Sequence, residues 1–202
     1  FVGPAVAGEW QISTRVLRVG RAVTSTHCEI YSDGALAAVL VGVYGSARNS
    51  AIAVELTGNA APRSVEQITE IPFPPEGIPV FVQHFAMRWA EGPGLFTGKR
   101  TPGKVFLHHR DPAPLTESHI VALADCPPPV AMSMYSAPAP GSTLVWSLEF
   151  LSHDFNFAPT AWWRIDHDID AGKDGYTHES GILYDPNGKP AALTRQLVTV
   201  FG

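Results

Sequence analysis

The stretch that decides the fold is VLRVGRAVTSTHCEIYSDGALAAVLVGVYGSAR, residues 16–48, because its pattern recurs near the end of the chain. One predicted strand ends in Gly20-Arg21, and the next leads into an Asp-containing turn that closes on Gly34. The later copy ends its first strand in Gly172-Lys173 and closes its turn on Gly188. The matching positions are separated by 152 and 154 residues. The chain is therefore predicted to contain two copies of one α+β unit, with its strands in one long antiparallel sheet.

Apolar periodicity extends this prediction to the rest of the chain. Residues 35–44 are almost continuously apolar, so this strand is expected to be buried on both faces. The mixed stretch 48–77 ends in IPFPPEG and is expected to be a connection. The predicted strands are 10–19, 22–31, 35–44, 78–89, 104–109, 143–151, 161–170, 176–184 and 191–201.

One helix is clearly indicated over residues 116–126. Thr116 can cap its start, apolar residues follow on one face, and Pro127-Pro128-Pro129 ends it. Shifted back by the repeat spacing, the counterpart of this helix would lie before residue 1. The first unit is therefore expected to lack its helix in this chain, and the parent protein is expected to carry a helix and a strand before Phe1.

Composition excludes several classes of protein. The 202 residues include 14 Lys and Arg against 19 Asp and Glu, giving a net charge of −5, which argues against a nucleic-acid binder. Hydrophobic residues make up 45% of the chain, enough for a core, but no apolar run reaches the roughly 20 residues of a membrane span. The two cysteines, Cys28 and Cys126, are interpreted as reduced, buried thiols of a cytoplasmic protein.

Several familiar chemistries find no support in the sequence. There is no Gly-x-Ser-x-Gly motif, and GPGLFTGKRT at 92–101 has the wrong spacing for a phosphate loop. The run at 166–170, DHDID, lacks the later Gly and Glu of a calcium loop, and its alternation predicts a solvated polar strand face. His108 and His109 are adjacent on a predicted strand, so their side chains should point to opposite faces. No metal and no cofactor is predicted.

Three polar residues lie where a core pattern would favour apolar ones. Asp125 ends the predicted helix, where the helix dipole disfavours a carboxylate. Thr143, which follows Ser142, opens the next strand, and Gln196 lies within the apolar run of the last strand. Each alone is compatible with an ordinary solvated position. Together they form the candidate site.

Five segments, taken in order, resemble the acyl-CoA thioesterase II family, whose members are double hotdog proteins. The resemblance covers essentially the whole chain and rests on order and spacing rather than on one motif. The segments are FVGPAVAG (1–8), the stretch at 16–48, VALADC (121–126), GSTLVWSLEF (141–150) and DPNGKPAALTRQLVTVFG (185–202).

This resemblance implies a tandem hotdog in which long antiparallel sheets wrap a helix. It implies a first hotdog unit at 1–75 and a second at 76–202 that carries the catalytic residues. It also implies that the chain self-associates, since hotdog sheets have open edges. In the family an Asp at the end of the second helix, a Thr or Ser on the next strand and a Gln on the last strand are catalytic. These positions correspond to Asp125, Thr143 and Gln196.

Two departures from the family bear on substrate choice more than on reaction type. Leu144-Val145-Trp146 follows the strand threonine, where many members have Asp-His and an aromatic-rich stretch. Pro127-Pro128-Pro129 after Asp125 is also unusual.

The function implied is hydrolysis of an acyl-CoA substrate to the free acid and CoA by activated water. Two alternatives remain open at this point. A hotdog hydratase or dehydratase would use a helix-region histidine with the aspartate, but His119 is six residues before Asp125 and about 240° away around the helix. A non-catalytic binder of acyl thioesters would carry the same residues without using them.

Overall fold

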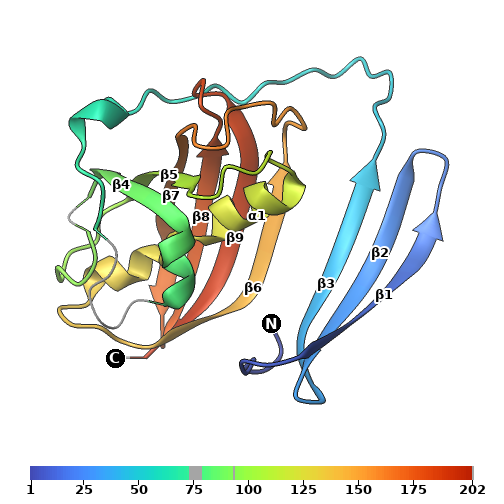
Figure 1. The fold of residues 1–202 in the computed structure, drawn as a ribbon, viewed down its shortest axis with the longest axis horizontal. Helices are drawn as coiled ribbons and strands as arrows, with labels where there is room; N and C mark the ends of the chain where they lie inside the picture. Colours follow the sequence, from blue (N-terminus) through green and yellow to red (C-terminus); the bar gives the residue numbers. More distant parts are fainter. Residues whose placement is uncertain (73–78, 93, 202) are drawn as a thin grey trace. The chain divides into compact units, whose positions relative to one another are not determined.

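The structure is a computed structural model that describes residues 1–72, 79–92 and 94–201. The chain divides into two compact units, Phe1–Glu55 and Leu56–Gly202 (Figure 1). The predicted boundary between residues 75 and 76 lies outside the described residues.

The first unit is a three-stranded antiparallel sheet. Its strands are β1 (Trp10–Val19), β2 (Val23–Ser32) and β3 (Ala35–Gly45), in the spatial order β1-β2-β3. Asp33 and Gly34 form the predicted two-residue turn between β2 and β3, with φ angles of 50° and 73°. Such left-handed angles are what a tight hairpin turn requires, and they explain why glycine follows aspartate here.

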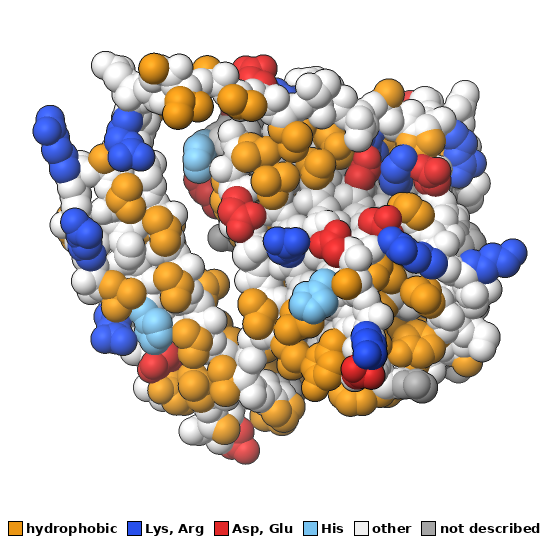
Figure 2. Space-filling view, turned by 180° about the vertical axis from the view of Figure 1, so that it is seen from behind, with side chains coloured by type: hydrophobic (Ala, Val, Ile, Leu, Met, Phe, Trp, Pro, Cys, Tyr) orange, Lys and Arg blue, Asp and Glu red, His pale blue; other side chains and the backbone are white. Residues whose placement is uncertain are grey.

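The prediction that residues 35–44 are buried on both faces is wrong. In β3, Leu40, Val41 and Val43 are 53%, 63% and 66% exposed. Figure 2 shows hydrophobic side chains at the surface of this unit. Residues 1–55 contain three strands and no helix. A sheet face is buried only when a second layer packs on it, and these residues supply no such layer.

The second unit is a six-stranded antiparallel sheet with the spatial order β4-β5-β7-β8-β9-β6. In the described residues the strands thus form two hydrogen-bonded sheets, not the expected single long one. The strands of this unit are β4 (Phe85–Glu91), β5 (Gly103–His109), β6 (Gly141–Phe150), β7 (Trp163–Lys173), β8 (Tyr176–Tyr184) and β9 (Pro190–Val200).

One predicted strand begins later than expected. Residues 78–89 were expected to be extended, but Val80–His84 forms the 3₁₀ turn η2, and β4 begins at Phe85. The Val82 amide donates to the carbonyl of Pro79 at 3.1 Å, which closes the turn. Pro79 has no amide hydrogen of its own and its φ is fixed, so it suits the first position of a turn. Residue 78 lies outside the described part of the chain.

The predicted helix is confirmed as α1 (Glu117–Asp125), with Thr116 as its N-cap. The backbone N–H of Thr116 donates to Nδ1 of His119 at 3.1 Å, so His119 completes the cap. Ile120, Leu123 and Ala124 are buried and face the sheet, as the i, i+3, i+4 pattern requires. The helix lies against the six-stranded sheet (Figure 1). Helix and sheet share one core, whose fully buried members include Val105, Leu107, Trp163, Ile165 and Leu183.

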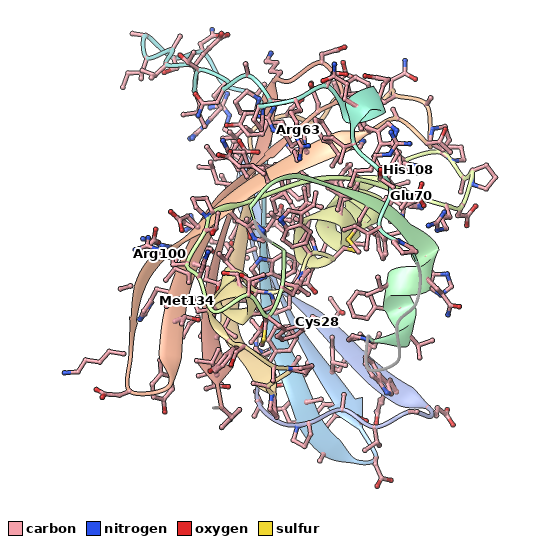
Figure 3. All side chains as sticks on the ribbon, turned by 90° about the vertical axis from the view of Figure 1, so that its left-hand side faces the viewer. Cys28, Arg63, Glu70, Arg100, His108 and Met134 are labelled. Carbon is pink, nitrogen blue, oxygen red and sulfur yellow. The ribbon has the colours of Figure 1, made fainter. Side chains whose placement is uncertain are left out.

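The connection from residue 56 to 72 belongs to the second unit. The short 3₁₀ turn η1 (Val65–Gln67) lies within it. The guanidinium of Arg63 donates to the carbonyl of Ala90 at 3.0 Å, and Glu70 pairs with Arg110 at 2.5 Å (Figure 3). The amide of Ile71 also donates to the carbonyl of Met87 at 2.8 Å. The connection is thus anchored to β4 and to the end of β5.

None of the helices in the described residues combines the length and the apolar character needed to span a membrane.

Candidate active site

Asp125 is the last residue of α1, between the buried residues Ala124 and Cys126. Part of the side chain reaches solvent, so a water molecule has access to it. The surrounding protein nevertheless removes enough water to raise the pKa of the carboxyl group above its ordinary value, and a hydrogen bond from Gln196 opposes this rise. The site therefore contains a carboxylate that is more basic than an ordinary aspartate.

Gln196, in the middle of β9, contacts that carboxylate directly. Its Nε2 donates to Oδ1 of Asp125 at 3.3 Å. The two residues are 71 positions apart in the sequence, so only the packing of α1 on the sheet brings them together. Two of the three predicted site residues thus meet.

Thr143 is on the same sheet face as Gln196 but does not complete a hydrogen-bonded triad. It lies in β6 opposite Val198, which is two residues from Gln196 along β9. The strand pairing is irregular between Thr143 and Val145, which indicates a bulge beside the site. In the described part of the chain, no hydrogen bond joins Thr143 to Asp125 or to Gln196. Its role stays a prediction.

Glu179 is a buried carboxylate beside the site that the sequence analysis missed. It lies in β8 directly opposite Gln196 and is only 5% exposed. Its carboxylate accepts backbone hydrogen bonds from Val130 at 2.8 Å and Ala131 at 3.0 Å. Burial raises the pKa of Glu179, and these hydrogen bonds oppose the rise. The alternation of β8 could have indicated it, since Leu183 is buried and Glu179 lies four residues earlier on the same face.

An aromatic residue lies on the other side of Gln196 in the sheet. Trp146 in β6 is its cross-strand neighbour, and the indole N–H donates to the hydroxyl oxygen of Thr194 at 2.7 Å. Trp146, Leu148 and Phe150 also pack against the buried core. Gln196 therefore lies beside apolar side chains on the β6 side of β9.

Cys126, next to Asp125, is not a candidate nucleophile. Both cysteines are free, but Cys28 is half-buried and only Cys126 is buried, so the predicted pair of buried thiols is half correct. Burial, with a smaller contribution from the charge of Asp125, raises the pKa of Cys126 to about 12. A thiol with that pKa stays protonated at neutral pH and is a poor nucleophile.

The histidines are placed away from the carboxylate. His119 caps the start of α1, whereas Asp125 ends it, so the two lie at opposite ends of a nine-residue helix. His108 contacts the ring of Trp162, and His109 contacts the ring of His119. This confirms that the adjacent pair points to opposite sides of β5.

The aspartates of β7 are ion-paired and only partly solvated. Asp166 pairs with Arg164 at 2.7 Å and is half-buried, which corrects the expectation of a solvated polar face. Asp168 pairs with Arg100 at 3.5 Å, and Asp170 pairs with Arg195 at 3.6 Å. Figure 2 shows acidic and basic side chains close together on the larger unit. Among the described residues there is no group of three side chains that could hold a metal.

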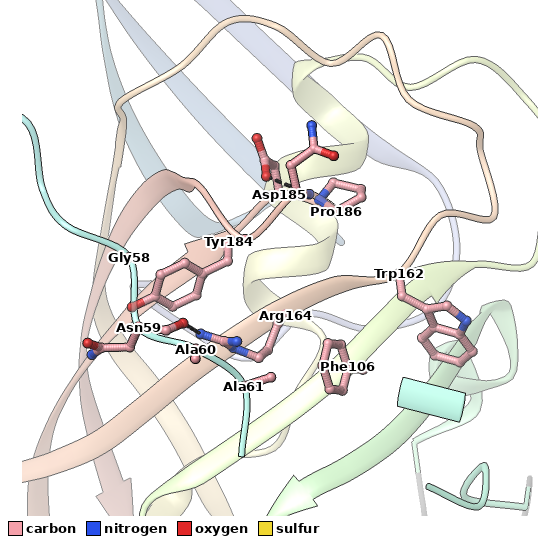
Figure 4. A pocket seen from close by; sticks show the side chains of 12 residues that line it. Gly58, Asn59, Ala60, Ala61, Phe106, Trp162, Arg164, Tyr184, Asp185 and Pro186 are labelled. Atoms are coloured by element: carbon pink, nitrogen blue, oxygen red, sulfur yellow. Dashed lines mark hydrogen bonds between the residues drawn. The ribbon is translucent and has the colours of Figure 1, made fainter. Parts of the chain in front are cut away.

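The opposite face of the sheet carries a separate cavity of about 370 Å³ (Figure 4). Trp162, Arg164 and Tyr184 line it, together with the start of the connection. The Arg164 guanidinium lies 4.3 Å from the Tyr184 ring centroid and donates to the carbonyl of Asn59 at 2.6 Å. Because its charge is also paired with Asp166, this arginine is structural and offers little to a ligand.

Comparisons with known proteins identify the family. The sequence pattern of the acyl-CoA thioesterase C-terminal domain matches residues 62–200, which include both members of the hydrogen-bonded pair and Thr143. No curated protein matches the chain.

Solved structures show the fold. A hot dog fold protein of unknown function from Alicyclobacillus acidocaldarius has a TM-score of 0.82 at 19% identity, over 95% of this chain and 72% of its own. The tesB protein of Mycobacterium avium subspecies paratuberculosis has a TM-score of 0.71 at 11% identity, over 96% of this chain and 72% of its own. The acyl-CoA thioesterase II TesB2 of Mycobacterium marinum has a TM-score of 0.69 at 18% identity, over 94% of this chain and 73% of its own.

Proposed function

Because this chain belongs to the family of the acyl-CoA thioesterase C-terminal domain, we propose that it hydrolyses an acyl-CoA to the free acid and CoA. The observation that carries the proposal is the hydrogen bond of 3.3 Å between Gln196 and a solvent-accessible Asp125 of raised pKa. A base and an oriented hydrogen-bonding partner are what water activation requires.

In the proposed reaction, water attacks the thioester carbonyl carbon while the Asp125 carboxylate takes one of its protons. As the new C–O bond forms, the π electrons of the carbonyl group move onto its oxygen. When these electrons return to re-form the carbonyl group, the C–S bond breaks. The departing CoA thiolate then receives the proton, so the products are a carboxylic acid and the CoA thiol. Raising the pKa of Asp125 makes it a better proton acceptor near neutral pH.

Gln196 and Thr143 have positioning roles in this proposal. The N–H group of the Gln196 amide holds the carboxylate, and in this proposal its carbonyl oxygen accepts a hydrogen bond from the attacking water. The Thr143 hydroxyl lies on the same sheet face and would supply a second hydrogen bond to that water. Both roles fix the line of attack and neither consumes a proton.

The alternatives receive less support. A hydratase needs a histidine near the carboxylate, but His119 is occupied in the cap at the far end of α1. A non-catalytic binder would not need a carboxylate of raised pKa at a solvent-accessible position.

A tandem hotdog whose first helix is missing from this chain is also part of the proposal. The meander β1-β2-β3 has the same order and the same antiparallel pairing as β7-β8-β9, which supports a repeat. We further propose self-association, because the apolar side chains of β3 lie at the surface. Sedimentation equilibrium of the purified chain tests this, and a monomer at all concentrations would refute it.

The function is tested by incubating the purified chain with a panel of acyl-CoAs and measuring release of free thiol. The panel should include short, long, branched and aromatic acyl groups, because the sequence departs from the family around Trp146. Thiol release from at least one substrate, with formation of the free acid, is expected. Hydration of an enoyl-CoA, or tight binding without turnover, would favour an alternative.

A further inference from the structure

The segment that follows Asp125 is unusually stiff. Cys126 leads into Pro127-Pro128-Pro129, and the 3₁₀ turn η3 (Val130–Met134) follows at once. Pro129 has a φ of −51° and a ψ of 138°, close to the polyproline conformation. Three consecutive prolines have fixed φ angles and leave the chain few ways to bend. These three prolines form a spacer between Asp125 and Val130.

The far end of the spacer is held by Glu179. Both carboxylate oxygens are used: Oε2 accepts from the Val130 amide at 2.8 Å, and Oε1 accepts from the Ala131 amide at 3.0 Å. The hydroxyl of Thr177 adds a weaker contact at 3.4 Å. Hydrogen bonds to a buried carboxylate are stronger than neutral ones, so the attachment is firm.

The same glutamate is the cross-strand neighbour of the other site residue. Glu179 and Gln196 are Cα partners in the β8–β9 ladder, on the helix side of the sheet. The contacts therefore form a closed ring: Asp125, the proline spacer, Val130, Glu179, the ladder to Gln196, and the Gln196 hydrogen bond back to Asp125. Each link is covalent, hydrogen-bonded or part of the sheet.

We propose that Glu179 is a positioning residue for the thioesterase reaction, acting through the Pro127-Pro128-Pro129 spacer to hold Asp125 against Gln196. This inference rests on the proposed function. A purely structural role for Glu179 would not require the carboxylate to sit across the ladder from Gln196. A misplacement of about 1 Å in a catalytic group can cost about 100-fold in rate.

Two variants test this by steady-state kinetics and thermal unfolding. Glu179→Gln keeps the size but offers one acceptor oxygen instead of two, so kcat should fall about tenfold or more while KM changes less than about threefold. Pro128→Gly loosens the spacer and leaves Glu179 untouched, so it should lower kcat in the same way even if the first variant folds poorly.

Two control variants distinguish a loss of kcat caused by misplacing Asp125 from one caused by lower stability. Val105→Ala removes buried methyl groups elsewhere in the core and should lower the melting temperature while keeping kcat at temperatures below unfolding. Pro186→Gly changes a proline in the turn before β9 and should keep kcat. The inference is overturned if Glu179→Gln and Pro128→Gly keep kcat within twofold, or lose it only as far as Val105→Ala does. Failure of the proposed function is distinguishable, because the wild type itself would then release no thiol from any acyl-CoA in the panel.

Discussion

Gln196 donates a hydrogen bond of 3.3 Å to the carboxylate of Asp125, although the two residues come from the last strand and the only α-helix of the described chain. The bond joins a polar residue within an apolar strand to a carboxylate at the unfavourable end of a helix dipole. Neither placement is favoured by folding alone, and the pair is partly open to solvent. These features are the basis for proposing that the pair activates water.

Replacing Gln196 with alanine should lower kcat by about tenfold, because the carboxylate loses its orientation. The hydrogen bond from Gln196 lowers the pKa of Asp125, so its loss should raise that pKa and move the acid limb of the pH–rate profile to higher pH. Arg195→Ala, on the opposite face of β9, is the control and should leave kcat and the acid limb of the pH–rate profile unchanged. An acid limb that does not move would argue against the contact in solution.

Thr143→Val removes the hydroxyl and keeps the branched shape. If the hydroxyl holds the attacking water, kcat should fall about threefold to tenfold, with little effect on stability. Ser142→Ala, at the exposed neighbouring position, is the matched control. Unchanged kinetics of Thr143→Val would remove Thr143 from the site and leave the other two residues in place.

The pH dependence of the wild-type enzyme follows from the raised pKa of Asp125. The base works only when ionised, so kcat/KM should fall as pH drops through the pKa of this group. That fall should lie above the ordinary aspartate value of 3.8, because burial disfavours the charged form. Activity assays between about pH 4 and 8 measure it. An acid limb at or below 3.8 would contradict the raised pKa.

His167 should make stability depend on pH independently of catalysis. Its Nε2 is enclosed and has no hydrogen-bond partner among the described residues, and burial lowers its pKa to about 4. In the unfolded chain this histidine has its ordinary pKa of 6.5 and binds the proton more tightly than in the folded chain. The free energy of unfolding should therefore be fully present above pH 6.5 and should fall as the pH drops toward 4. The full shift corresponds to about 3 kcal/mol. Urea unfolding of wild type and His167→Gln, which cannot titrate, should show a smaller loss between pH 7 and 4.5 in the variant; equal losses would refute this.

Local patterns predicted most of the fold. The strand at 10–19 and the strand at 176–184 have the predicted bounds, and the helix differs from its predicted range by one residue at each end. These elements are set by periodicity, by the Thr116 cap and by prolines, all of which act within a few residues. The burial of β3 was not predictable in this way, because burial depends on what packs on the strand and not on its own composition.

The site was predictable only in part. Asp125, Thr143 and Gln196 were predicted because polar residues are conspicuous in apolar surroundings and because the chain resembles a known family; of these, Asp125 and Gln196 are in contact. Glu179 was missed because the first half of its strand, YTHESGILY, is mostly polar, so a glutamate there does not differ from its neighbours in sequence. The alternation of β8 indicates that Glu179 is buried, but its partners are visible only in the structure, where β8 lies between β7 and β9 and the amides of Val130 and Ala131 donate to its carboxylate.

The most direct test of the central claim is thiol release from a good acyl-CoA substrate by Asp125→Asn compared with wild type. The substitution keeps the size of the side chain and removes its basicity, so kcat should fall by about 10²–10⁴-fold while acyl-CoA binding changes little. Binding of a non-hydrolysable acyl-CoA analogue, measured by calorimetry, confirms that the variant is folded. If Asp125→Asn binds the analogue and hydrolyses the substrate at the wild-type rate, Asp125 is not the general base and the proposed mechanism is wrong.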